Sequence, residues 1–133
     1  MTFSLHPNLA NKIEVFQLPL CTVLLEDECH YPWLLLVPRR ANAARMMDLL
    51  VADQHQLMVE LNVAQKIVWE VFFPDQINVA AIGNKTPQLH VHVIARFHSD
   101  PAWPGTVWDH PTRAAYASEE KQRLVRQLAV AFS

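Results

Sequence analysis

Short hydrophobic stretches, bounded by proline, glycine or polar residues, predict five β-strands along the chain. They cover residues 13–18, 20–26, 33–37, 77–82 and 88–97. Pro19 separates the first two strands and Pro38 follows the third, because proline has no N–H group to donate to a sheet. The third stretch is apolar throughout, which is typical of a well-buried strand. Gly83 and Asn84 form a turn signal after the fourth.

A longer period between residues 53 and 73 predicts the main helix, because apolar residues recur there every three or four positions. Those on the main face are Leu57, Met58, Leu61, Ala64, Val68, Val71 and Phe72. Asp53 is expected to cap the start of this helix and Pro74 to end it. Further apolar residues lie at Val59, Val63, Ile67 and Trp69. They predict either a second buried face or a subunit interface.

Two shorter segments flank the predicted core with further structure. Residues 46–50 predict a short helical piece before the main helix. Ser118 is a favourable N-cap for a C-terminal helix. The buried face of that helix is expected at Leu124, Val125, Leu128, Ala129 and Phe132. The proline-rich loop before it contains Trp103 and Trp108, which are expected to pack over the edge of the core.

These elements predict an α+β fold, in which an antiparallel sheet of about five strands packs on one long helix, with a C-terminal helix added. A chain of 133 residues has the length of one domain, 1–133. Its core is expected over residues 13–97, followed by the loop and helix of residues 98–133. Hydrophobic residues make up 51% of the chain and charged residues 18%, which is a globular composition.

Charge and hydropathy exclude several classes of protein. The net charge of −2 gives no sign of the strongly basic face of a dedicated nucleic-acid binder. No apolar run reaches the 18 residues needed to span a membrane, so no membrane partner is expected. The N-terminus lacks the pattern of a signal peptide, which predicts a cytoplasmic protein. Cys21 and Cys29 form no C-x-x-C unit and are expected to be buried, reduced thiols.

Glycine is scarce, and this excludes two common phosphate-binding loops. The chain has only two glycines, Gly83 and Gly105, and neither precedes a lysine. A dinucleotide fingerprint needs three closely spaced glycines, and a P-loop needs two with a lysine after the second. Any phosphate bound by this protein is therefore held by other groups, and no cofactor is expected.

The last predicted strand concentrates the polar chemistry of the chain on one face. Alternation places Gln88, His90, His92 and Arg96 on this face, opposite a core face that begins with Leu89. Neighbouring side chains on one strand face lie about 6.6 Å apart, so a single phosphate group can contact both histidines. One neutral imidazole can then act as a nucleophile and the other as a hydrogen-bond donor, with Arg96 adding positive charge.

Residue spacing leaves three interpretations of this face open. It is an exposed polar face without function, a metal site, or a site of phosphoryl or nucleotidyl transfer through a covalent histidine intermediate. In the metal interpretation, His90 and His92 bind zinc together with a third ligand such as His98 or His110. The spacing of the histidines does not separate the last two interpretations.

The motif and its surroundings resemble the histidine-triad (HIT) family. Residues 88–94, followed by Arg96, are similar to the family signature His-x-His-x-His, two apolar residues and commonly Pro-Arg. Residues 31–40 resemble the family's buried strand, which ends in proline and basic residues. The long helix and the strand before the motif follow in the same order, so the resemblance covers residues 13–97. The chain looks most like small bacterial HIT proteins with glutamine at the first triad position.

The resemblance implies a nucleotide hydrolase or nucleotidyl transferase that acts on a nucleoside phosphoramidate, a nucleotidyl ester or a dinucleoside polyphosphate. In HIT enzymes the middle histidine, here His90, attacks the α-phosphate and forms a nucleotidyl-histidine that water hydrolyses. The last histidine, here His92, helps to bind the phosphate and the leaving group. Gln88 takes the first position, and Asn84 matches an asparagine that contacts phosphate or sugar. The family also forms homodimers.

Two departures from the family pattern favour an alternative function. Gln88 replaces a triad histidine, and a glutamine can neither carry a positive charge nor relay a proton. Ala41 occupies a position where many members have a histidine that reaches the leaving group. The loop over residues 83–87 is also short. The alternative is therefore a protein that binds nucleotides with little or no catalysis.

Overall fold

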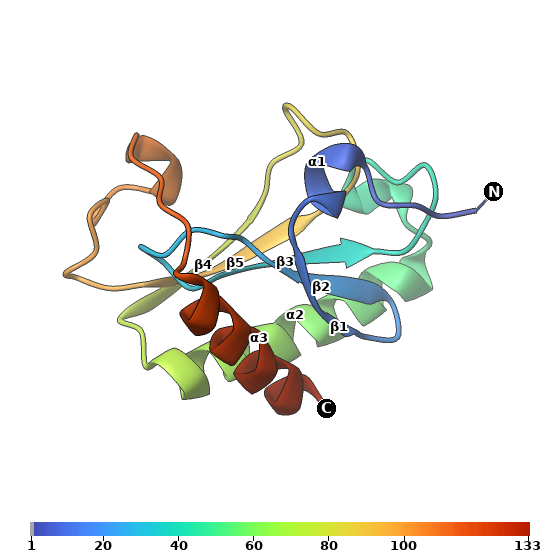
Figure 1. Ribbon diagram of the computed structural model, residues 1–133. Coiled ribbons are helices and arrows are strands. Elements are labelled where there is room, and N and C mark those ends of the chain that lie inside the picture. The colour runs from blue at the N-terminus through green and yellow to red at the C-terminus, as the bar shows by residue number, and fades with distance from the viewer. Residues whose placement is uncertain (1) are drawn as a thin grey trace.

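The structure is a computed structural model that describes residues 2–133, and it contains a five-stranded antiparallel sheet in the order β1-β2-β3-β5-β4 (Figure 1). The strands are β1 (Ile13–Gln17), β2 (Cys21–Leu25), β3 (Trp33–Pro38), β4 (Gln76–Ala81) and β5 (Val91–Arg96). The α-helices are α1 (Pro7–Ala10), α2 (Val51–Phe72) and α3 (Ser118–Phe132). Two 3-10 turns cover Met46–Asp48 and Val107–Asp109. The predicted α+β architecture is confirmed.

The larger core lies between the sheet and the two long helices. Strands β2 and β3 are buried along their whole length, as expected for apolar runs in the middle of a sheet. Val91, Val93 and Ala95 of β5 point into this core, which confirms the predicted core face of the strand. Leu124, Leu128 and Phe132 of α3 also belong to this core.

The opposite face of the sheet carries a second, smaller core. It consists of Leu9, Leu24, Tyr31, Trp33, Leu35, Val37, Ile94 and Val107. In Figure 1, α1 and the loop before β5 lie on this side of the sheet, away from α2 and α3. Because of this cover, only 8% of His90 and 7% of His92 is exposed. The polar face of the motif strand is therefore largely covered.

The structure corrects the start of both long helices. The N-cap of α2 is Leu50, which makes no side-chain hydrogen bond. Asp53, the predicted cap, lies in the first turn and accepts from Arg40 Nε at 2.7 Å and Nη2 at 3.1 Å. The N-cap of α3 is Ala117, so Ser118 is the first helical residue. The Asp53 carboxylate, which was predicted to cap the helix, therefore forms an ion pair with Arg40 instead.

Glu60 of α2 fixes the beginning of β2. Its carboxylate is 2% exposed and accepts from the backbone N–H groups of Leu20 and Cys21, both at 2.8 Å. Burial and the adjacent Glu60 raise the pKa of the Cys21 thiol. Both cysteines are free thiols, as predicted, but Cys29 is exposed and the prediction of burial is wrong for it. Within residues 2–133, no helix combines the length and apolar character of a membrane span.

Candidate active site

His90 lies just before β5, and a backbone carbonyl determines which of its nitrogens carries the proton. Its Nδ1 is 2.7 Å from the carbonyl oxygen of Gln88. A carbonyl oxygen only accepts hydrogen bonds, so Nδ1 must carry the hydrogen. In the neutral imidazole, Nε2 then keeps its lone pair. His90 is therefore held in the tautomer that can act as a nucleophile.

His92 is held in the opposite tautomer. The indole Nε1–H of Trp33 donates to Nδ1 of His92 at 2.9 Å. An indole N–H can only donate, so Nδ1 of His92 is the acceptor and Nε2 carries the hydrogen. Burial, together with the neighbouring His90 and the positive charges of Lys12 and Arg113, lowers the pKa of His92 to about 3. His92 is therefore a neutral hydrogen-bond donor near pH 7.

The two imidazoles lie next to each other in one pocket. Their ring centroids are 5.1 Å apart, and the rings are close to perpendicular. The pocket they line, called here the histidine pocket, has a volume of about 540 Å³. Its other walls are Asn8, Leu9, Asn11, Lys12, Glu26, Trp33, Leu35, Ile82, Asn84, Lys85, Thr86, Trp108 and Arg113. Segments from both ends of the chain therefore complete a site that starts from one strand.

A second pocket of about 340 Å³ adjoins the first at His90. Asn84, His90 and Ile82 line both pockets, and Gln88 lines the second. Arg45 and Met46, from the segment before α2, also line this second pocket. His90 therefore lies where two pockets meet, and an extended ligand can occupy both of them.

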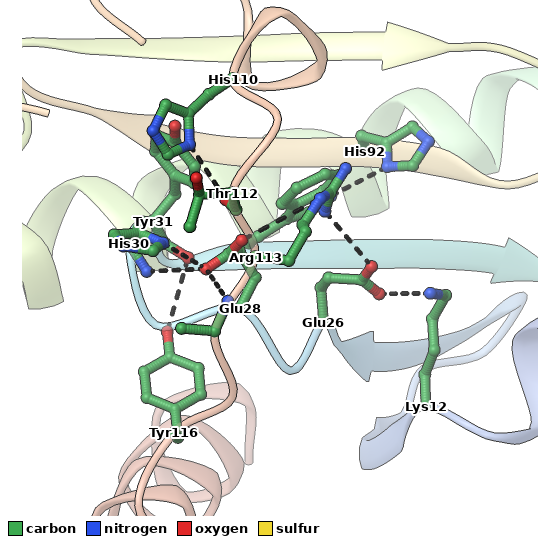
Figure 2. Close-up of polar contacts among 12 residues, drawn as sticks. Lys12, Glu26, Glu28, His30, Tyr31, His92, His110, Thr112, Arg113 and Tyr116 are labelled. Atoms are coloured by element: carbon green, nitrogen blue, oxygen red, sulfur yellow. Dashed lines mark hydrogen bonds and ion pairs between the residues drawn. The ribbon is translucent and has the colours of Figure 1, made fainter. Parts of the chain in front are cut away.

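The histidine pocket has an excess of positive charge. Lys12, Lys85 and Arg113 line it together with one carboxylate, that of Glu26. Lys12 forms an ion pair with Glu26, and Arg113 Nη1 lies 3.9 Å from the same carboxylate. Figure 2 shows Arg113 between Glu26 and Glu28, with Lys12 on the other side of Glu26. With Glu28 also beside Arg113, two carboxylates still do not neutralise three cations, so this pocket favours an anionic ligand.

Aromatic rings pack against the charged residues of the histidine pocket. The guanidinium carbon of Arg113 lies 4.9 Å from the ring centroid of Trp33. Trp108 makes edge contacts with Trp33 at 5.6 Å and with His92 at 5.0 Å between centroids. Trp108 thus packs over the second core, as predicted for a loop tryptophan, and also lines the histidine pocket. The indole of Trp33 therefore contacts both Arg113 and His92.

Gln88 belongs to the loop before β5, because the strand starts at Val91 instead of residue 88 as predicted. The backbone N–H of Leu89 donates to Ala43, outside the sheet ladder. The side chain of Gln88 contacts the N-terminal segment: its Oε1 accepts from His6 N–H at 2.8 Å, and its Nε2 donates to the carbonyl of Ser4 at 2.9 Å. Gln88 and Leu89 are therefore hydrogen-bonded to segments outside the sheet instead of to a neighbouring strand.

Arg96 lies outside the histidine pocket, contrary to its expected place beside a phosphate. Its guanidinium is 2% exposed and donates to both carboxylate oxygens of Asp100, at 2.8 and 3.0 Å. A third bond, of 2.7 Å, goes to Asn78 on β4. Arg96 therefore ties β5 to β4 and to the following loop, and the phosphate contact assigned to it is withdrawn.

The suggested third metal ligands lie apart from the histidine pair. His98 lies beside Asp75 and Trp103, while His110 packs against His30 with 5.5 Å between ring centroids. Within residues 2–133, the group of three side chains with metal-ligand spacing is Glu28, Cys29 and His30, which does not include the pair. The metal interpretation of His90 and His92 therefore finds no third ligand in the described chain.

Sequence reasoning missed several pocket residues because they lie in segments without periodicity. Asn8 and Lys12 come from the lead-in to β1, and Arg113 comes from the loop before α3. Isolated basic residues in such segments are ordinarily part of a solvated surface. Only the folding of both chain ends over the sheet brings these groups to His92.

Comparison with known proteins identifies the family. Residues 9–99 match the family described as HIT domain. This chain belongs to the HIT family. HIT proteins bind nucleotides and are generally nucleotide hydrolases or transferases. The matched region includes Gln88, His90 and His92, and it begins within α1.

Solved structures of bacterial histidine triad proteins match this HIT protein over nearly its whole length. One from Bradyrhizobium japonicum has 40% identity and a TM-score of 0.96, with 100% of each chain covered. Another from Marinobacter aquaeolei has 36% identity and a TM-score of 0.94, covering 98% of this chain and 96% of the other. A third from Sinorhizobium meliloti has 35% identity and a TM-score of 0.93, covering 98% and 97%. A search of curated proteins finds no match.

Proposed function

We propose that this HIT protein is a nucleotide hydrolase or nucleotidyl transferase that works through a covalent nucleotidyl-histidine at His90. The observation that carries the proposal is the pair of opposite tautomers. Gln88 C=O leaves His90 Nε2 with a lone pair, and the Trp33 indole leaves His92 Nε2 with a hydrogen. A nucleophile beside a neutral donor suits attack on a phosphate that carries negative charge.

In the proposed first step, Nε2 of His90 forms a bond to phosphorus as the bond to the leaving group breaks. The leaving group departs with that electron pair and takes up a proton from water. In the second step, a water oxygen attacks the same phosphorus. The P–N bond breaks, its electron pair returns to Nε2, and the proton of the water goes to solvent. The product is a nucleoside monophosphate, or another ester if an alcohol replaces water.

His92 and Asn84 support this step by binding phosphate oxygens. The Nε2–H of His92 supplies a neutral donor that stays in place over a wide pH range because its pKa is about 3. Asn84 lines both pockets at His90, where its amide can donate to the phosphate or the sugar. Gln88, at the first triad position, contributes its backbone carbonyl to His90.

The expected substrates are nucleoside phosphoramidates, nucleotidyl esters and dinucleoside polyphosphates. The test is steady-state turnover of one member of each class by the wild type, His90→Ala and a control, His55→Ala. We expect His90→Ala to lose more than about a thousandfold in kcat. His55 lies on α2 and is exposed, so its replacement leaves the rate unchanged. Equal rates in His90→Ala and the wild type would refute the mechanism.

A second candidate is a nucleotide-binding protein with little or no catalysis, and two observations favour it. Both polar ends of the Gln88 amide are engaged by the N-terminal segment, so they are not free to act on substrate. Ala41 offers no proton donor to a leaving group. Calorimetry with nucleoside monophosphates, run beside the turnover assays, separates the two functions. Tight binding without turnover of any substrate supports this second candidate.

We also propose that the protein forms a homodimer through α2 and the edge strand β4. Val59, Val63 and Trp69 are exposed on α2, and Val79 is 44% exposed on β4. β4 is the last strand of the sheet, so within the described chain one side of its backbone has no strand partner. A second copy of the chain would cover both the apolar surface and the open edge.

A further inference from the structure

The turn between β2 and β3 presents three kinds of metal-binding atom in consecutive residues. Glu28, Cys29 and His30 offer a carboxylate oxygen, a thiol sulfur and an imidazole nitrogen, and these atoms lie within 4.8 Å of one another. We call these three residues the turn cluster. The histidine pocket is lined by other residues, so the turn cluster is separate from the candidate active site.

A buried oxygen of Glu28 lacks a partner, and this makes the turn cluster a candidate site. The side chain is 1% exposed, and its contacts go to Oε2: the N–H groups of His30 and Ala114 donate at 3.1 and 3.4 Å, and His30 Nδ1 lies at 2.7 Å. Within residues 2–133, Oε1 has no hydrogen-bond partner. Arg113 Nε, at 4.0 Å, is too far away to donate to it. A bound cation would supply the partner that this buried oxygen lacks.

The short contact between His30 and Glu28 is one that a metal ion can take over. A carboxylate oxygen accepts hydrogen bonds, so in the neutral imidazole the hydrogen between the two atoms belongs to Nδ1 of His30. The ring can carry this hydrogen on Nε2 instead, which leaves Nδ1 free to bind a metal. Two donor atoms on one tetrahedral zinc lie about 3.4 Å apart, so the pair needs to open only slightly.

His110 adds a fourth donor from the loop before α3. Its Nδ1 lies 3.0 Å from the carbonyl oxygen of Thr112, so Nδ1 carries the hydrogen and Nε2 keeps the lone pair of the neutral ring. The ring stands edge-on to that of His30, with 5.5 Å between centroids. Two imidazoles on one tetrahedral zinc have centroids about 5 Å apart. In Figure 2, His110 and His30 lie to the left of Glu28, and Arg113 lies to its right.

We propose a zinc site that joins the turn between β2 and β3 to the loop before α3, with the ligands Glu28, Cys29, His30 and His110. This inference does not depend on the proposed function. A thiolate with imidazoles and one carboxylate suits zinc, whereas magnesium and calcium prefer oxygen ligands. The thiolate and the carboxylate together balance the charge of a divalent ion. On binding, the thiol of Cys29 releases its proton to solvent and the sulfur bonds to zinc.

Zinc at this site would fix the loop that supplies two residues of the histidine pocket. Trp108 and Arg113 line that pocket, and they flank His110 in the sequence. The turn and the loop already meet through the backbone, because the N–H of Cys29 donates to the carbonyl of Ala114 at 2.7 Å. Zinc adds a link between side chains of the same two segments, so we expect the loop to become more rigid.

The experiment uses the full chain without a histidine tag, kept reduced and freed of metal with a chelator. Cobalt(II) is titrated first, because a cobalt–thiolate bond gives a charge-transfer absorption band, and zinc then displaces cobalt to give the zinc affinity. We expect one equivalent of metal and a thiolate band. Alkylation by iodoacetamide should slow at least about tenfold with zinc. It reports on Cys29, since burial raises the pKa of the Cys21 thiol and keeps it unreactive.

Four single variants test the ligands: Glu28→Gln, Cys29→Ser, His30→Gln and His110→Gln. We expect Cys29→Ser to lose the thiolate band, and each variant of the turn cluster to bind zinc more than about a hundredfold more weakly. His110→Gln should weaken binding about tenfold or more. Hydrogen exchange of residues 107–116 should slow on addition of zinc in the wild type but not in His110→Gln.

Two further variants are the controls. His98 also lies beside a carboxylate, with 3.7 Å between its Nδ1 and Oδ1 of Asp75, so His98→Gln is the matched control for loss of a histidine. The double variant His90→Ala/His92→Gln removes the histidine pair of the candidate active site. Both should bind one equivalent of cobalt with the thiolate band of the wild type.

Several results would overturn the inference. Less than one equivalent of metal, or binding without a thiolate band, would mean an adventitious ion only. Loss of the metal in His90→Ala/His92→Gln would assign it to the candidate active site. Equal zinc affinity in Cys29→Ser and the wild type would exclude the turn cluster, and this variant decides if Glu28→Gln does not fold, because Cys29 is exposed. Unchanged affinity in His110→Gln would overturn the link to the loop.

Discussion

Two histidines with the same chemistry differ at this site because their Nδ1 atoms meet different partners. A backbone carbonyl accepts from His90, and an indole N–H donates to His92. Each partner can act in only one direction, so these two hydrogen bonds are enough to fix the tautomers. Nε2 of His90 is left with its lone pair, and Nε2 of His92 is left with a hydrogen that it can donate.

The role of Trp33 gives the first prediction. Trp33→Phe keeps an aromatic ring but removes the donor to His92, so that histidine populates both tautomers. We expect kcat to fall about tenfold, the effect of losing roughly one oriented hydrogen bond in the site. Nitrogen-15 spectra of the imidazoles measure the tautomers directly. Trp69→Phe, on the exposed side of α2, serves as the control. A variant that keeps a single His92 tautomer would contradict this assignment.

The second prediction concerns stability against pH. The pKa of His92 is about 3 in the folded protein, below its ordinary value of 6.5. Between these values the unfolded chain binds a proton that the folded chain does not, so stability is lost as pH falls below 6.5. At pH 5 the loss from this residue is about 2 kcal/mol, and it is absent above about pH 7.5.

The check is urea unfolding of the wild type and His92→Gln at pH 7.5 and 5. Glutamine can still accept from the indole of Trp33 but does not titrate. The free energy of unfolding should therefore fall by about 2 kcal/mol less in the variant than in the wild type. Other histidines contribute equally to both proteins, so the comparison isolates His92. Equal losses in the two proteins would show that His92 has an ordinary pKa.

At the scale of elements, one carboxylate joins the main helix to the sheet. Glu60 is buried on α2 and accepts from two N–H groups at the start of β2. The segment between β1 and β2 contains Pro19 and turns sharply, so these two groups need a partner outside the ladder. The helix supplies this partner, which explains why a charged residue occurs on its buried face.

The third prediction follows from this contact. Glu60→Leu leaves the N–H groups of Leu20 and Cys21 buried without an acceptor, and we expect a loss of about 2–4 kcal/mol in the free energy of unfolding. Glu70→Leu, an exposed position on the same helix, is the matched control and should change stability by less than about 0.5 kcal/mol. Urea unfolding measures both. Similar small losses in the two variants would show that Glu60 is dispensable.

At the scale of the whole molecule, both ends of the chain complete what the central segment begins. Residues 4–12 and the loop before α3 cover the face of the sheet that carries the histidines. They bring Lys12 and Arg113 to the pocket that His92 lines. The same arrangement leaves α2 and β4 uncovered on the far side, with apolar side chains exposed.

The fourth prediction tests the proposed dimer on this uncovered side. Val63→Glu and Val79→Lys each place a charge in the apolar surface, at a cost of several kcal/mol if a partner buries it. Sedimentation should therefore show a dimer for the wild type and a monomer for both variants. Val130→Glu on α3, 75% exposed, is the control and should remain dimeric. A monomeric wild type would exclude the proposed interface.

Periodicity and turn residues were enough to predict the elements and their order, because both report local structure directly. The 3–4 spacing predicted α2, alternation predicted the two faces of β5, and proline marked the strand ends. Resemblance to the HIT signature pointed to His90 and His92, and the family is confirmed. Whether His90 is the nucleophile stays a prediction.

The surroundings of these residues depend on long-range packing, which no local pattern reports. Gln88 and Arg96 share the motif with the histidines, yet Gln88 hydrogen-bonds to the N-terminal segment and Arg96 pairs with Asp100. No local pattern encodes contacts between residues more than 80 positions apart, since they depend on how the chain ends fold over the sheet. Charge near His92 likewise comes from Lys12 and Arg113, which have no motif of their own. The sequence thus determined which chemical groups the strand carries, and packing decided what each of them faces.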